Sequence, residues 1–334
     1  PAHEYHFYMG DYLKSKGATG ILNVTKLQHI GQENTIIKRI YEQRFLLSEH
    51  IHNTFPASLA AEAEALIIGI QDHVDADITR AYQKLGITHL FAISGLHVAL
   101  LSWMFFQGLL RLRVRREFAT LILIVILPIY ALLAGGAPSV WRAVSVVEFV
   151  MLARYFRWRL PIDDALAISF IVFVLLQPGA VYQVGFQLSY LATVSLIYSG
   201  PILARARTWW MQGFVMTFVC QLLTYPILLL HFYELSLSSF LANVIFVPLF
   251  SFVILPINIV LLLISFLPGP FANWLFMLYE PARTFLTDVI LFLQSVPYQM
   301  WVPGKPSVVW MIVLYASVFT TFICLTKGTR YWKV

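Results

Sequence analysis

Polar residues whose types and spacing could support chemistry lie in four short clusters between apolar runs. The first cluster, 89–97, reads HLFAISGLH. In a continuous helix His89 and His97 would lie about 12 Å apart along the axis, which is too far for them to share a metal ion. A helix break before Gly95 would instead direct backbone amides, the Ser94 hydroxyl and His97 toward one cavity. Ser94 and His97, one helical turn apart, could also act as the nucleophile and base of a hydrolase, although no carboxylate nearby in the sequence would orient the histidine.

The second cluster, 135–142, reads GGAPSVWR and predicts the start of a helix that could receive an anion. Pro138 suits the first position of a helix, where free backbone amides and the helix dipole favour an anion such as phosphate. Packing explains Arg142 poorly, because an arginine at the centre of a membrane helix costs about 2.5–3.5 kcal/mol on insertion scales. Near the interface the same side chain would simply reach the water. Glu148 lies on roughly the opposite side of an ideal helix, so we expect no ion pair between it and Arg142.

The third and fourth clusters place amides, hydroxyls and a histidine inside apolar runs. Gln187 and Ser189 form the third, and His231, Asn243 and Pro248 belong to the fourth. Interrupted helices that carry such groups at membrane depth are how transporters build binding sites. The alternative is that these side chains only bridge helices, at about 0.6 kcal/mol each.

Two further patterns have structural interpretations. Glu280 and Arg283 lie three residues apart in an apolar run, and this spacing predicts an ion pair within one helix. Cys220 and Cys324 lie in different apolar runs, without the spacing of a metal site or a disulfide framework. We therefore expect no metal ligands and no cofactor.

The composition places these clusters inside a membrane. Of the 334 residues, 59% are apolar and 12% are charged, and the mean hydropathy is +0.74. Soluble domains carry about 45–50% apolar and about 25% charged residues. Several runs of about 18 or more mostly apolar residues are each long enough to cross a hydrocarbon core of about 30 Å. These values exclude an ordinary soluble enzyme and predict an all-α, polytopic membrane protein with interrupted helices.

Nine apolar segments follow residue 88, and each could cross the membrane once. Their expected limits are about 89–110, 118–134, 138–153, 164–177, 180–203, 209–231, 240–266, 271–296 and 306–326. Basic residues cluster after the first, third, fifth and ninth segments. Because such residues concentrate on the cytoplasmic side, residues 1–88 are expected outside and the C-terminus inside. In the seventh segment, which holds Pro248 and Pro256, we expect one broken span rather than a re-entrant hairpin.

Residues 1–88 contain no spanning segment and are expected to form an extracytoplasmic region, with residues 89–334 as the transmembrane domain. The pattern predicts an amphipathic helix over 34–55 and a second helix after Pro56. These helices could lie on the bilayer surface or pack on a neighbouring soluble domain. The sequence begins with Pro1 and shows no signal peptide, so we interpret it as a piece of a longer protein.

The run HLFAISGLHVALL at 89–101, preceded by LGI at 85–87, resembles the signature of the ComEC/Rec2 family of competence proteins. Three further stretches agree with that family in order and spacing, at 137–143, 185–192 and 225–248. The resemblance covers about residues 60–330. It implies a membrane channel that conducts single-stranded DNA across the cytoplasmic membrane during natural transformation.

The resemblance also implies partners and missing domains. The partners are single-stranded DNA, the lipid bilayer, an external DNA receptor and a cytoplasmic ATP-driven DNA translocase. In full-length members an OB-fold domain precedes the membrane domain and a metallo-β-lactamase-like domain follows it; residues 7–24 would be the exit from the first. The sequence has no His-x-His-x-Asp-His metal motif and no Walker-type motif, so we expect no enzymatic activity and no use of ATP.

On this interpretation ten residues of the four clusters would line the path of the DNA. They are His89, Ser94, Gly95, His97, Pro138, Arg142, Gln187, Ser189, Asn243 and Pro248. Arg142 and the helix start at Pro138 would meet phosphates at the outer mouth, and the neutral groups would let a polyanion keep moving. Two other classes stay open: a small-solute or ion transporter, and an intramembrane hydrolase using Ser94 and His97. The formal net charge of +6 is weak support for DNA, because most cations are the loop residues that set topology.

Overall fold

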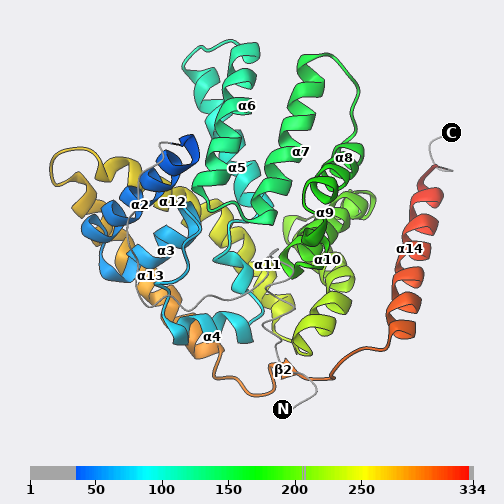
Figure 1. Cartoon of the computed structure of the whole chain (residues 1–334). Coiled ribbons are helices and arrows are strands. Elements are labelled where there is room, and N and C mark those ends of the chain that lie inside the picture. The colour runs from blue at the N-terminus through cyan, green and yellow to red at the C-terminus, as the bar shows by residue number, and fades with distance from the viewer. Residues whose placement is uncertain (1–34, 205, 207, 331–334) are drawn as a thin grey trace, which may run out of the picture.

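The chain is almost entirely α-helical in a computed structural model that describes residues 35–204, 206 and 208–330 (Figure 1). Strands in this part of the chain are limited to β1 (Leu235–Ser236) and β2 (Met300–Trp301), which form one short antiparallel pair. The all-α prediction is therefore confirmed. The segment 7–24, expected to leave an OB-fold domain, lies outside the described residues.

Helices occupy all nine predicted apolar segments. They are α5 (Gly95–Arg111), α6 (Arg116–Leu133), α7 (Pro138–Tyr155), α8 (Ile162–Leu176), α9 (Val184–Leu203), α10 (Trp209–Phe232), the run α11 to α12, α13 (Phe271–Leu293) and α14 (Val308–Arg330). Short 3₁₀ helices, η1 (Thr88–Leu90) and η2 (Pro178–Tyr182), precede α5 and α9. Four described stretches are long and apolar enough to cross a membrane: Thr88–Arg111, Arg116–Leu133, Trp210–Phe232 and Ser239–Ser265. The number of spans stays a prediction.

The seventh segment is one continuous helical run, with a π-helical turn in place of the predicted break. It consists of α11 (Ser239–Leu249), the π-helical segment η3 (Phe250–Ile254) and α12 (Leu255–Ser265). Pro248 lies just before the π turn and Pro256 just after it. A proline removes one backbone donor, and the wider turn absorbs the irregularity without ending the helix.

The membrane helices share their apolar faces in overlapping groups. Residues of α5, α6 and α7 form one core, and residues of α7, α8 and α9 form a second. The helices α9 and α10 pack closely together, and α14 packs beside them at the edge of the bundle (Figure 1). Because α7 contributes to both cores, it is the central helix of this half of the protein.

The helices that precede residue 88 also pack into the bundle. They are α2 (Ile36–Thr54), α3 (Ala57–Ile67) and α4 (Ala76–Lys84). Nearly all of α3 is buried, and it packs against α2, α12 and α13 (Figure 1). This differs from both placements considered for α3, the bilayer surface and a neighbouring soluble domain, since helices of the same chain cover its apolar residues.

Candidate functional site

Arg142 of α7 lies in the interior of the bundle, where only 6% of its surface is exposed. Its Nε donates a hydrogen bond to Ser189 Oγ on α9 at 2.8 Å, and its Nη1 donates to Thr193 Oγ1 one turn further along. The guanidinium carbon lies 6.0 Å from the centre of the Tyr190 ring. Within the described part of the chain, Arg142 forms no ion pair with a carboxylate. Hydroxyl groups and an aromatic ring therefore hold this buried charge.

Gly95, the first residue of α5, leaves room for the guanidinium of Arg142. A Cβ atom at Gly95 would overlap Arg142 Nη2, whereas a Cβ at Gly108 on the same helix would meet nothing within 4 Å. A larger residue at position 95 would therefore displace Arg142. The structure thus brings together three of the ten predicted path residues, Gly95, Arg142 and Ser189, from three different helices.

A chain of hydroxyl groups continues from α9 to α8 and α7. Tyr190 OH lies 2.9 Å from Ser169 Oγ, which lies 2.7 Å from Ser145 Oγ. Ser145 Oγ also donates to the backbone carbonyl of Arg142 at 2.9 Å. Lipid tails cannot satisfy such hydroxyls, so they bond to one another across the helices. The polar region around Arg142 therefore extends through three helices.

The helix break predicted before Gly95 is present, with Ser94 as the N-cap of α5. Ser94 Oγ accepts a hydrogen bond from the His97 backbone N–H at 3.3 Å, and the Ser94 backbone N–H donates to His97 Nδ1 at 3.4 Å. This is a capping box in which a histidine takes the place of the usual Glu or Gln. Ser94 and His97, the nucleophile and base of the hydrolase alternative, lie next to each other. However, each side chain bonds to the backbone of the other residue. The arrangement starts a helix and does not place the hydroxyl against the imidazole.

Side chains from two other segments bind the backbone carbonyls that the break leaves free. Ser139 Oγ of α7 donates to the Ile93 carbonyl at 3.1 Å, and Gln71 Nε2 donates to the Phe91 carbonyl at 3.1 Å. Protein groups thus satisfy this irregular backbone. His89, on η1, is exposed.

Gln187 and His231 connect α9 to α10. His231 Nε2 lies 3.0 Å from Gln187 Oε1, and Gln187 Nε2 donates to the Val181 carbonyl at 2.8 Å. These contacts agree with the helix-bridging alternative for both residues. Asn243 of α11 differs, because its Oδ1 is buried and has no hydrogen-bond partner among the described residues. A buried acceptor without a partner costs free energy, so the Asn243 oxygen is a predicted path group still able to accept a bond.

The start of α7 has the predicted geometry. Pro138 is its first residue and follows Gly135 and Gly136, whose φ angles of +86° and +69° let the chain turn sharply after α6. Arg44 of α2 approaches this turn, since its Nη2 lies 2.8 Å from where a Cβ at Gly135 would be. The contacts of Arg142 are with α9 and α5, so a joint phosphate contact by Pro138 and Arg142 stays a prediction.

The ion pair predicted between Glu280 and Arg283 is wrong. Arg283 of α13 pairs instead with Glu62 of α3, and their side chains are only 7% and 6% exposed. Glu280 accepts a hydrogen bond from Ser58. Local spacing points to a partner on the same helix, whereas the true partner lies 221 residues away in the sequence and cannot be found from spacing.

Polar side chains from three helices complete the surroundings of this ion pair. Arg283 Nη2 donates to Tyr82 OH at 3.1 Å, and Asn258 Nδ2 and Tyr279 OH each lie 3.4 Å from Glu62 Oε1. Burial raises the pKa of the Tyr82 phenol above its ordinary value, so Tyr82 stays neutral. A buried ion pair is tolerated only when its remaining donors and acceptors are satisfied, and this network satisfies them.

Two residues of these networks, Thr193 and Glu62, were not predicted, although the sequence carries a signal for each. The four-residue spacing of Ser189 and Thr193 places both hydroxyls on one face of α9. Glu62 lies in the stretch AAEAEALI, which is apolar apart from Glu62 and Glu64, and an acidic residue there must find a partner when the helix is buried.

Possible metal ligands come together away from the four clusters. They are His52 of α2, Glu64 of α3 and His73 of the segment that follows α3, and their ligand atoms all lie within 4.8 Å of one another. These residues are separated in the sequence without the spacing of a metal motif, and none was predicted.

The chain matches the family described as Competence protein over residues 66–328. This range includes all ten predicted path residues. It begins within α3, so it also takes in α4 and the helix break before Gly95.

Three curated proteins are similar to the chain over most of its length. ComE operon protein 3 of Bacillus subtilis is 29% identical over 321 residues, which are 96% of this chain and 41% of that protein. Competence protein ComA of Neisseria gonorrhoeae is 30% identical over 81% of this chain and 39% of its own length. Recombination protein 2 of Haemophilus influenzae is 28% identical over 78% of this chain and 34% of its own length. The chain thus spans at most 41% of these relatives, and no solved structure matches it.

Proposed function

Because the chain belongs to the Competence protein family, we propose that its helices form a channel for single-stranded DNA across the cytoplasmic membrane during natural transformation. The chain spans less than half of each relative named above, so we assign to it only the membrane passage. An external receptor would deliver the DNA and an ATP-driven partner would pull it, since the sequence has no Walker-type motif. OB-fold and metallo-β-lactamase-like domains would lie in other parts of the full-length protein.

The observation that carries this proposal is the buried guanidinium of Arg142 without a carboxylate partner. A guanidinium presents its donors in a planar fork that matches phosphate oxygens. Its present acceptors are the neutral hydroxyls of Ser189 and Thr193. A phosphate oxygen can replace a neutral hydroxyl as the acceptor and forms the stronger, charge-assisted bond.

The neutral groups beside Arg142 suit a polyanion that must keep moving. Strong ion pairs at every step would hold the strand, whereas amides and hydroxyls give weaker contacts that do not depend on base sequence. Ser189 and the free Asn243 oxygen supply such groups from α9 and α11. We therefore propose that these residues follow Arg142 along the path.

We propose nine spans, with α4 outside and the basic loops inside. The loop between α5 and α6 contains Arg113 and Arg115, and the loop between α7 and α8 contains Arg157 and Arg159. Both loops lie at the end of the bundle away from α4 and β2 (Figure 1). Basic residues at a single end agree with the orientation expected from the positive-inside rule.

Crosslinking of DNA during uptake tests the channel directly. Cells that carry single-cysteine variants would receive a strand with a thiol-reactive group, and its transfer would be arrested before completion. We expect crosslinks at Ser189→Cys and Asn243→Cys. The control is Leu196→Cys, also on α9, whose native side chain is 42% exposed on the outside of the bundle. Crosslinks at the control position and none at the two path positions would contradict the channel.

A further inference from the structure

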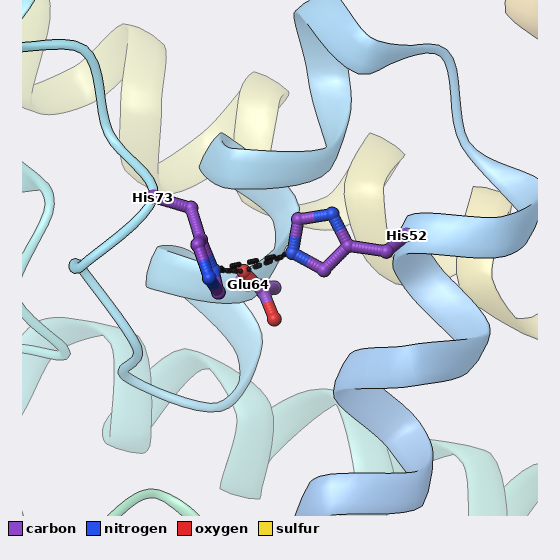
Figure 2. Close-up of side chains that lie close together, drawn as sticks. All are labelled: His52, Glu64 and His73. Atoms are coloured by element: carbon purple, nitrogen blue, oxygen red, sulfur yellow. Dashed lines mark hydrogen bonds and ion pairs between the residues drawn. The ribbon is translucent and has the colours of Figure 1, made fainter.

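Three side chains from separate segments converge on one point beside α3 (Figure 2). His52 Nε2 lies 2.9 Å from Glu64 Oε2, and His73 Nδ1 lies 2.7 Å from the same oxygen. The two ring nitrogens lie 3.2 Å from each other, and the rings are nearly perpendicular, at 86°. Figure 2 shows the side chains of His52 and His73 both directed at the Glu64 carboxylate. Each of the three ligand atoms is therefore within contact distance of the other two.

The carboxylate at the centre of this group is buried and lacks a permanent positive partner. The Glu64 side chain is 0% exposed, whereas those of His52 and His73 are 38% and 52% exposed. Among the described residues, its contacts are the two imidazoles and the Ser48 hydroxyl; no Lys or Arg pairs with it. A buried carboxylate needs compensation of its charge, either from protonated imidazoles or from a cation.

We propose that His52, Glu64 and His73 bind a zinc ion. Two imidazole nitrogens and one carboxylate oxygen are a common zinc ligand set, with water in the fourth position. Tetrahedral ligands at about 2.1 Å from zinc lie about 3.4 Å from one another. The three contacts of 2.7 to 3.2 Å therefore need to open by about 0.2 to 0.7 Å to admit the ion. The half-exposed imidazoles leave the fourth position open to solvent.

The ion would tie the segment after α3 to α2 and α3, which already pack against each other. His52 is in the last turn of α2, Glu64 is on α3, and His73 lies between α3 and α4. The last of these segments also carries Gln71, which bonds to the carbonyl of Phe91 at the helix break. Zinc at this site would thus fix the position of the segment that supports the break before α5.

Zinc binding by the full chain tests the proposal. Untagged protein in detergent would be stripped with a chelator, dialysed against zinc and analysed for bound metal. We expect one zinc ion per chain, a higher Tm with zinc than without it, and a visible spectrum of low-symmetry coordination when cobalt replaces zinc. A stripped protein that takes up no stoichiometric zinc and shows no zinc-dependent Tm would overturn the proposal.

Substitutions of the two histidines test whether zinc binds at this site. His52→Gln and His73→Gln should each weaken zinc binding about tenfold or more, because each removes one ligand. His50→Gln is the matched control: His50 is on the same helix, bonds to Ser265 at 2.8 Å and stacks on Phe266, and its loss should leave binding unchanged. Zinc should raise the Tm of each ligand variant less than it raises the Tm of the native protein. Zinc binding that persists unchanged in both ligand variants would place the metal elsewhere and refute this site.

Discussion

Arg283 of α13 and Glu62 of α3 form a buried ion pair although 221 residues separate them in the sequence. The pair joins the first part of the chain to one of its last helices. It explains why α3 is an integral part of the bundle, because a glutamate and an arginine in apolar helices can be buried only if they meet. The helices before residue 88 therefore contribute to the membrane part of the fold.

Removing either member of this pair should destabilise the protein strongly. Glu62→Gln and Arg283→Gln should each lower the free energy of unfolding by about 3–5 kcal/mol, because each leaves the other charge buried without its partner. Unfolding in detergent micelles, followed by circular dichroism, measures this effect.

The double variant Glu62→Leu with Arg283→Met should lose much less than the sum of the two single effects, since no unpaired charge remains. Lys38→Gln is the control, because Lys38 and Glu42 form an exposed pair at 3.7 Å that contributes about 0.3–0.5 kcal/mol. If Glu62→Gln and Arg283→Gln lowered the free energy of unfolding no more than Lys38→Gln does, the result would contradict a buried ion pair.

Arg142→Gln should reduce the uptake of labelled DNA into the cytosol about tenfold. The variant keeps a polar side chain but loses one charge-assisted contact with phosphate, worth about 1.5 kcal/mol. Arg154→Gln, at the exposed end of the same helix, should leave uptake unchanged. Normal uptake by Arg142→Gln at the same protein level would remove Arg142 from the path.

Gly95→Ala should impair uptake through its effect on Arg142. The added methyl group would overlap the guanidinium, which would have to leave its position between α5 and α9. Gly108→Ala on the same helix adds a methyl group in open space and should stabilise α5 by up to about 1 kcal/mol. Uptake assays and Tm measurements on the two variants separate these effects, and equal behaviour of both would show that Gly95 is not required for space.

Ser94→Ala should lower stability by about 1 kcal/mol, because α5 loses its N-cap. Ser94→Asn should retain both stability and uptake, since asparagine is an equally good and neutral N-cap but cannot act as a serine nucleophile. Labelling with a serine-directed fluorophosphonate should not modify Ser94. Loss of function in Ser94→Asn, together with labelling of the native protein, would instead favour the hydrolase alternative.

Local sequence patterns predicted the helices and the break before Gly95, but not the tertiary partners. The apolar runs have the length and periodicity of helices, and Ser94 followed by Gly95 is a typical helix start. The predicted partner of Arg283 was wrong, because spacing within one helix carries no information about contacts with α3. His52, Glu64 and His73 were missed for the same reason, because only the packing of α2 on α3 brings them together.

The π-helical turn in the seventh segment determines which changes of chain length this helix can accept. Before the turn, Phe246 faces the core that contains α4; after it, Leu261 faces the core that contains α2 and α3. The π turn holds one residue more than the α-helical turn it replaces, so deleting one residue from 250–254 would restore a regular α-helix with little rotation of α12. Inserting one residue there as a further α-helical position would instead rotate α12 by about 100° relative to α11. Asn258 would then turn away from Glu62, although no residue in either network had been substituted. Insertions at this turn should therefore be far rarer among related sequences than exchanges of one apolar residue for another.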